Sequence, residues 1–212
     1  MDNNLIKCLF LDVGGVLMSN GWGHELRQKV SEVFNIEYDE MNMRHTQMFD
    51  IYENGKITFD EYLTKSIFFK KRDFSLQQLK TYIFDAVRPF QEMMDFIKEV
   101  KKEHGLKVAL VSNEGRELAE DRFRRFDMSF VDFFIVSSFV HYRKPDVDIY
   151  HLAIDTAQVL PSEILYIDDR EFLTEIGEGL GMHAIWHQNI ESTKKQMAEK
   201  FNLGITPASS AH

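Results

Sequence analysis

Polar side chains follow each of four short apolar runs in this sequence. The groups at these four points are Asp12, Ser112 with Asn113, Arg143 with Lys144, and Asp168 with Asp169. If the runs are parallel strands of one sheet, these groups gather at the edge formed by the carboxyl ends of the strands, where open α/β sheets bind ligands. A carboxylate, a hydroxyl, an amide, an amine and an acidic pair then meet in one crevice.

This combination of groups is typical of phosphoryl transfer. An anionic nucleophile can approach an anionic phosphate only when cations neutralise the charge between them, and Lys144 supplies one such cation. The carboxylates of Asp12, Asp168 and Asp169 would repel one another at close range, whereas Mg²⁺ prefers hard oxygen ligands of this kind. The sequence therefore predicts a magnesium site beside the reacting group.

The first apolar run begins at Ile6 and ends at Asp12, and Gly14 and Gly15 follow within three residues. Residues without a Cβ let the backbone approach a ligand closely, so we expect Gly14 and Gly15 to bind the phosphate together with Ser112. We expect the Asp12 carboxylate to be exposed at the end of the strand. An aspartate that only caps the turn remains an alternative for this stretch taken alone.

Short apolar runs and helical patterns alternate along most of the chain. Buried parallel strands are predicted at residues 6–11, 107–112, 133–138, 164–167 and 183–186. Crossover helices are predicted at residues 92–104, 116–126, 148–158, 172–180 and 191–201. The predicted fold class is α/β, a doubly wound, parallel, five-stranded Rossmann-like sheet.

Residues 18–87 lack β-branched runs and show helical spacing instead. Helices are predicted near residues 24–34 and 39–52, and the spacings Thr58 to Glu61 and Ser75 to Gln78 are those of capping boxes ahead of two more. We therefore expect an inserted four-helix cap over a catalytic core of residues 1–17 and 88–205. Residues 206–212 have too little apolar content to pack and are expected to fray.

Composition limits the partners and the compartment. The chain has 212 residues with 25 Lys and Arg against 34 Asp and Glu, a formal charge of -9, which disfavours nucleic acid and anionic membranes as partners. Cys8 is the only cysteine, and no apolar run is long enough to span a membrane. We expect a cytoplasmic monomer or homodimer that acts on a small phosphorylated metabolite.

Four motifs in order resemble those of the haloacid dehalogenase superfamily of hydrolases, in the subgroup with a helical cap inserted after the first motif. The motifs are DVGGVL at 12–17, VSN at 111–113, RKPD at 143–146, and IDD at 167–169 followed by GLGM at 179–182. The resemblance covers nearly the whole chain and implies a phosphatase that works through an aspartyl phosphate.

The resemblance also implies a role for each motif residue. Asp12 is similar to the family's nucleophile, Ser112 to the hydroxyl that bonds its oxygens, and Lys144 to the neutralising cation. Backbone N–H groups near Asn113 would bind the phosphate. The implied metal ligands are Asp12, the Gly14 carbonyl, Asp169 as the main carboxylate and Asp168 as its partner.

Two positions depart from the family pattern. Most phosphatases of this superfamily have an aspartate two residues after the nucleophile as general acid, and this chain has Gly14; a frequent further carboxylate is replaced by Leu173. The rate should then depend strongly on the leaving group unless water or a cap residue such as His24 or His45 donates the proton. A dehalogenase that needs no metal and a binding protein without turnover remain the alternative functions.

Overall fold

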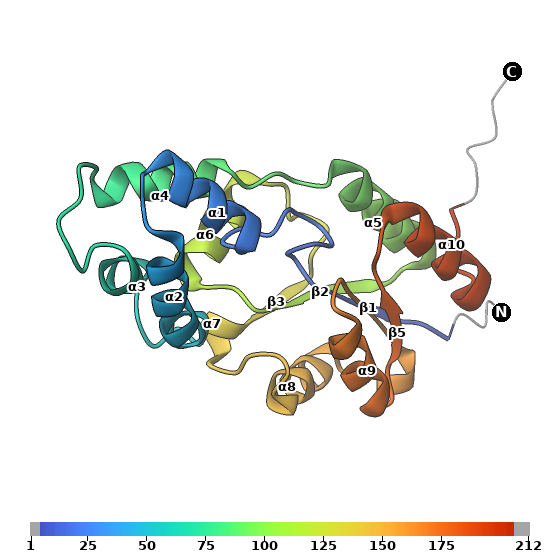
Figure 1. The fold of residues 1–212 in the computed structure, drawn as a ribbon. Coiled ribbons are helices and arrows are strands. Elements are labelled where there is room, and N and C mark those ends of the chain that lie inside the picture. The colour runs from blue at the N-terminus through green and yellow to red at the C-terminus, as the bar shows by residue number, and fades with distance from the viewer. Residues whose placement is uncertain (1–4, 206–212) are drawn as a thin grey trace, which may run out of the picture.

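The computed structural model describes residues 5–205, and five parallel strands form its central sheet (Figure 1). Their order across the sheet is β3-β2-β1-β4-β5. The strands are β1 (Cys8–Leu11), β2 (Lys107–Ser112), β3 (Phe133–Val136), β4 (Ile164–Asp168) and β5 (His183–Trp186). The doubly wound α/β fold predicted from the sequence is confirmed.

Strand β1 lies at the centre of the sheet because all four of its side chains are apolar and buried. Leu9 and Leu11 face one hydrophobic cluster, and Cys8 and Phe10 face the cluster on the other side. This alternation follows from the two-residue period of a strand. Asp12 comes next, at the carboxyl end of the central strand.

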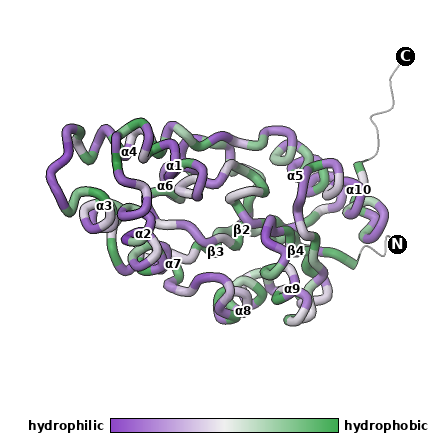
Figure 2. Tube along the Cα trace, viewed as in Figure 1, coloured by the Kyte–Doolittle hydropathy of each residue, from purple (hydrophilic) through white to green (hydrophobic). Residues whose placement is uncertain are grey.

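Helices cover both faces of the sheet (Figure 1). Helices α5 (Gln91–His104) and α10 (Ile190–Phe201) contribute to the first cluster, and α8 (Val147–Ala157) and α9 (Glu171–Gly179) contribute to the second. Hydrophobic stretches lie along the sheet and alternate with hydrophilic ones along the helices (Figure 2). This three-layer core fixes the strand ends on which the polar residues stand.

The insertion forms the four helices expected for the cap. They are α1 (His24–Val33), α2 (Tyr38–Glu53), α3 (Phe59–Ser66) and α4 (Leu76–Asp85). Both predicted capping boxes are present, from Thr58 with Glu61 at α3 and from Ser75 with Gln78 at α4. Leu118 of the core helix α6 (Arg116–Arg125) packs into the cap's own hydrophobic cluster.

Strand β3 is shorter than the sequence predicted. It ends at Val136, and Ser137 begins a short helix, α7 (Ser137–Val140), that sequence analysis missed. The buried Ser137 hydroxyl donates to the Glu53 carbonyl oxygen at 2.7 Å and accepts from the Glu114 N–H at 3.0 Å. These long-range bonds turn the chain out of the sheet toward the cap. A further short 3-10 helix spans Pro161–Glu163.

The two chain crossings between core and cap run side by side. The Ser19 N–H donates to the Arg88 carbonyl oxygen at 2.9 Å, and the Phe90 N–H donates to the Leu17 carbonyl oxygen at 2.8 Å. Residues 206–212, expected to fray, lie outside the described residues. Among the helices of residues 5–205, none is both long and apolar enough to cross a membrane.

Candidate active site

Asp12 is held from two sides at the end of β1. The Ser112 hydroxyl donates to Asp12 Oδ1 at 2.8 Å, and Lys144 Nζ donates to the same oxygen at 2.9 Å. The structure corrects one expectation, because Asp12 is only 4% exposed rather than open at the strand end. The carboxylate is thus in contact with Lys144 and Ser112, and it also lines a cavity shared with residues of the cap.

All three N–H donors of Lys144 have partners within the site. Besides Asp12, Nζ donates to Asp168 Oδ2 at 2.6 Å and to the Tyr166 hydroxyl at 3.2 Å. Burial alone would lower the pKa of Lys144, but the charges of Asp12 and Asp168 raise it above its ordinary value. Lys144 is therefore a fixed positive charge between two carboxylates.

Asn113 holds the backbone that carries this lysine. Its side-chain Nδ2 donates to the Lys144 carbonyl oxygen at 2.8 Å, and its Oδ1 accepts from the Lys144 N–H at 2.7 Å. The two bonds tie the loop after β2 to the loop ahead of α8. Asn113 was expected at the site for the backbone N–H groups near it, and the structure adds this role for its side chain.

Asp168 uses both carboxylate oxygens inside the core. Oδ2 accepts from Lys144 and from the Tyr166 hydroxyl, and Oδ1 accepts from the Arg170 N–H at 2.9 Å. Burial would raise the pKa of Asp168, but Lys144 and Tyr166 hold it below its ordinary range. Tyr166 was not predicted as a site residue, because a tyrosine within an apolar strand usually packs in the core.

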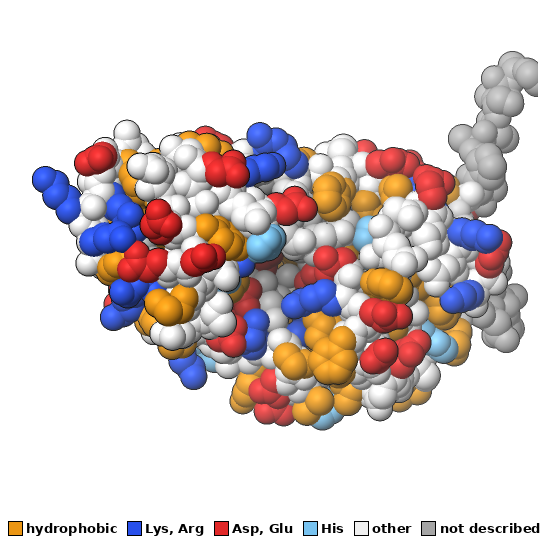
Figure 3. Space-filling view, in the orientation of Figure 1, with side chains coloured by type: hydrophobic (Ala, Val, Ile, Leu, Met, Phe, Trp, Pro, Cys, Tyr) orange, Lys and Arg blue, Asp and Glu red, His pale blue; other side chains and the backbone are white. Residues whose placement is uncertain are grey.

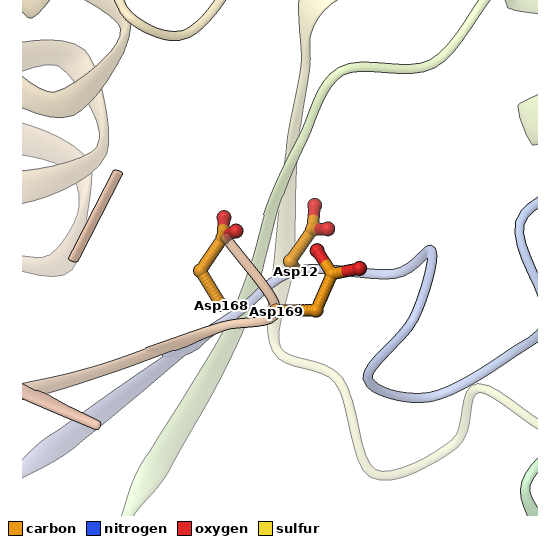
Figure 4. A group of neighbouring side chains, drawn as sticks. All are labelled: Asp12, Asp168 and Asp169. Atoms are coloured by element: carbon orange, nitrogen blue, oxygen red, sulfur yellow. The ribbon is translucent and has the colours of Figure 1, made fainter. Parts of the chain in front are cut away.

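The carboxylates of Asp12, Asp168 and Asp169 point to the same side of the sheet edge (Figure 4). One oxygen from each lies within 4.8 Å of the others. Burial and the negative charges of Asp12 and Asp168 raise the pKa of Asp169 to about 6. Gly15 makes this packing possible, since its φ of 78° is left-handed and a Cβ there would overlap the Asp169 carboxylate.

A cavity of about 300 Å³ lies between the cap and the strand ends. Residues of both parts line it, among them Asp12, Trp22, Phe49, Glu53, Ser112, Asn113, Glu114, Arg122, Arg143, Asp169 and Arg170. Acidic and basic side chains gather around the hollow at this junction (Figure 3). Every predicted strand-end group with a reactive side chain is therefore at this cavity or in contact with a residue that lines it.

Two charged pairs at the cavity were not recognised in the sequence. Arg143, preceding Lys144, donates to Glu53 Oε2 of the cap from Nη2 at 2.6 Å and from Nε at 3.1 Å. Glu114, two residues beyond Ser112, forms a buried ion pair with Arg122 of α6. The rule that located Ser112, a polar residue just past a strand end, applies equally to Glu114.

The position of the missing acid is occupied from elsewhere. A Cβ added to Gly14 would lie 2.6 Å from Asn20 Oδ1, so the Asn20 amide fills the space into which an aspartate at 14 would grow. Within residues 5–205, neither His24 nor His45 lines the cavity. His45 is buried against the Tyr62 hydroxyl at 2.8 Å, and burial and the charge of Arg27 lower its pKa to about 3.

The architecture is thus a parallel α/β core with an inserted helical cap, and Lys144 and three carboxylates meet at its strand ends. The chain belongs to the haloacid dehalogenase-like (HAD-like) hydrolase family, because the model of that family matches residues 6–172. It is also 24% identical over 189 residues to a phosphorylated carbohydrates phosphatase of Thermotoga maritima, covering 85% of this chain and 84% of that protein.

Solved structures share the same fold. A HAD-like family hydrolase of Porphyromonas gingivalis superposes with a TM-score of 0.74 at 21% identity, over 92% of this chain and 99% of that one. A HAD family enzyme of Bacteroides thetaiotaomicron, in complex with magnesium and inorganic phosphate, superposes with a TM-score of 0.71 at 20% identity. The match covers 85% of this chain and 93% of that one. The L-2-haloacid dehalogenase of Xanthobacter autotrophicus superposes with a TM-score of 0.61 at 13% identity. The match covers 98% of this chain and 91% of that one.

Proposed function

We propose that this protein is a Mg²⁺-dependent phosphatase that hydrolyses a small phosphomonoester through an aspartyl phosphate on Asp12. The observation that carries the proposal is the pairing of Ser112 and Lys144 on one oxygen of Asp12, beside the acidic trio. This arrangement orients a buried carboxylate and balances its charge. Asp12 can therefore act as the nucleophile.

The chain's own residues account for the handling of charge. Lys144 offsets the negative charge of Asp12, so that a phosphate dianion can approach it. The Ser112 hydroxyl fixes which Asp12 oxygen is engaged and leaves the carboxylate in one orientation. Arg170, which lines the cavity, adds positive charge on the side of Asp169.

The donor set suits Mg²⁺. Asp12, Asp169 and the Gly14 carbonyl would hold the ion, with Asp168 beside them, and three carboxylate oxygens close together form a hard, anionic site. Burial and the charges of Asp12 and Asp168 raise the pKa of Asp169, and a divalent cation would relieve the charge repulsion. When bound, the ion would neutralise phosphate oxygens during transfer.

The cavity supports a small polar substrate. A volume of about 300 Å³ is at the lower end of small-molecule sites. Trp22 and Phe49 offer apolar faces, and the charged groups of Glu53, Glu114 and Arg143 offer hydrogen bonds to hydroxyl groups. A phosphorylated carbohydrate or similar metabolite fits these features, and the Thermotoga maritima relative is a phosphatase of that substrate class.

Asp12→Asn tests the proposal in a panel of phosphorylated metabolites, with and without Mg²⁺. We expect hydrolysis by the wild type only with Mg²⁺, and a loss of at least about 10³-fold in the variant, because an amide cannot form the acyl phosphate. Asp155→Asn, an exposed substitution on α8, serves as the matched control and should keep full activity.

Retained hydrolysis by Asp12→Asn in a preparation free of other phosphatases would remove Asp12 as nucleophile. Release of halide from 2-haloacids without added metal would instead identify a dehalogenase. No turnover of either substrate class, together with retained phosphate binding, would indicate a binding protein.

A further inference from the structure

The site lacks a proton donor at the position where the family usually has one. Gly14 has no side chain, and the Asn20 amide that fills this space has no acidic proton to give. An alkoxide leaving group nevertheless needs a proton when its bond to phosphorus breaks. A donor must therefore be sought among the other groups at the cavity.

Glu114 is a carboxyl group built into the core side of this cavity. It is 7% exposed and follows Ser112, the residue bonded to Asp12, by two positions. Its backbone N–H donates to the Ser137 hydroxyl at 3.0 Å, which holds this residue against the start of α7. Oε1 contacts Arg122, and Oε2 has no hydrogen bond to any residue in the described range 5–205.

Charged groups of both the core and the cap act on Glu114. Burial, Asp12 and Glu53 disfavour the carboxylate, whereas Arg122 and Lys144 favour it, and together they raise the pKa of Glu114 to about 7. Arg122 is itself 1% exposed and donates from Nη2 to the Ser19 carbonyl oxygen at 3.2 Å. Glu114 can therefore hold a proton near neutral pH, and Arg122 is placed to stabilise the carboxylate left behind.

Glu53 is the other buried glutamate at the cavity, and it is less suited to this task. Arg143 donates twice to its Oε2, and the charges that act on it most strongly are those of Arg143, Arg170 and Asp50. Asp12 is prominent among the charges acting on Glu114 and absent from the main ones acting on Glu53. Glu114 is thus the glutamate coupled to the reacting carboxylate.

We propose that Glu114 is the general acid and base of the reaction, in place of the absent aspartate at position 14. This inference rests on the proposed phosphatase function. In the first step an Asp12 oxygen bonds to phosphorus, the ester P–O bond breaks, and the leaving oxygen takes the proton of Glu114. In the second step water attacks phosphorus, the Asp12 O–P bond breaks, and the water proton passes to Glu114.

The test compares Glu114→Gln with wild type on nitrophenyl, phenyl and alkyl phosphates, in order of increasing leaving-group pKa, with the chemical step measured in single turnovers. We expect a shallow dependence in wild type. In the variant the alkyl phosphates should slow by about 10²-fold and the nitrophenyl phosphate by less than about threefold, because only poor leaving groups need the acid. Glu53→Gln is the matched control, and it should change all rates by one common factor.

Glu114→Gln leaves the Arg122 charge buried without its partner, so the fold of the variant must be checked by thermal melting. If this variant does not fold, the double variant Glu114→Gln with Arg122→Gln removes both charges, and the same steepened dependence is expected. A uniform rate change across the series in the folded variant would overturn the role of Glu114 while leaving the phosphatase function in place. Absence of phosphate hydrolysis in wild type would overturn both.

Discussion

Asp168 and Asp169 are neighbours in the sequence, but their side chains have different partners. Asp168 accepts from Lys144 and Tyr166 inside the core, while Asp169 lies against Gly15 and lines the cavity. A carboxylate with its oxygens already bonded is less free to bind an ion than one facing a cavity. We therefore expect Asp168 to position Lys144 and Asp169 to bind the metal.

Calorimetric titration of Mg²⁺ into Asp169→Asn and Asp168→Asn separates these roles. Asp169→Asn should weaken Mg²⁺ affinity by at least about tenfold, because loss of a residue that only orients a metal ligand already costs about 10 to 100-fold, and loss of a direct ligand costs no less. Asp168→Asn should mainly lower turnover, through loss of a partner of Lys144. Equal affinities in all three proteins would exclude the acidic pair from the metal site.

The pH dependence of Mg²⁺ binding follows from the raised pKa of Asp169, which is about 6 in the folded protein. Above this pH the carboxylate is ionised and ready to bind the ion, and below it a proton competes. Affinity should fall about tenfold for each pH unit below 6, with proton release on binding. In Asp169→Asn, titration over the same range should lack this component, and an unchanged slope would contradict the assignment.

At the scale of single elements, α3 begins at a junction of cap and core. Thr58 and Glu61 form its capping box, and the Phe59 N–H donates to Glu117 Oε1 of the core helix α6 at 3.0 Å. Free N–H groups at a helix start need acceptors, and here one acceptor comes from a different part of the fold. The start of α3 thus couples helix stability to cap docking.

Thr58→Ala should lower the free energy of unfolding by about 1 kcal/mol, because the Glu61 N–H loses its side-chain acceptor. Urea unfolding followed by circular dichroism measures this difference. Thr46→Ala is the control, since Thr46 is exposed within α2 and its hydroxyl donates only to the Asn42 carbonyl oxygen at 2.9 Å. A loss of the same size in both variants would argue against a specific capping effect.

At the scale of the whole molecule, hydrogen bonds and ion pairs dock the cap onto the core. Arg143 bonds to Glu53 and lies 3.1 Å from Asp50 Oδ1, and His141 Nδ1 lies 2.8 Å from the Asn54 carbonyl oxygen. Gly115 also lets the Tyr52 ring pack against the start of α6, because a Cβ there would overlap the ring. These contacts hold the end of α2 and the turn after it against the core, beside the cavity.

We predict that the cap opens about its two crossings, residues 18–23 and 87–89, and closes when the site is filled. Arg143→Ala should increase hydrogen exchange in both crossings, because it removes two contacts between core and cap. Lys70→Ala is the control, since Lys70 pairs with Glu40 at 2.6 Å within the cap. Beryllofluoride with Mg²⁺ should reduce exchange and compact the scattering profile of the wild type.

Equal exchange in the Arg143→Ala and Lys70→Ala proteins, with no compaction on adding beryllofluoride, would indicate a fixed lid. In that case substrate entry would have to use the cavity mouth as it stands. The predicted boundaries of core and cap would stand, but the two crossings would connect them without acting as hinges.

The sequence by itself determined the five strands, the cap helices and the list of strand-end groups, but not the end of β3 or the short helix α7. Strand and helix periods are local, so β2 and β5 were predicted to the residue, and the capping boxes at Thr58 and Ser75 were found from spacing alone. Parallel topology then places Asp12, Ser112, Lys144 and Asp169 at one edge.

Only the tertiary structure decided which of these side chains meet and how deeply they are buried. Lys144 contacts Asp12, 132 residues away, and Tyr166, 22 residues away, and Arg122 reaches Ser19 across 103 residues. Such contacts depend on how layers pack, because no local period encodes the approach of two distant side chains. The burial of Asp12 and the environment of Glu114 both follow from that packing, and local patterns in the sequence cannot supply either.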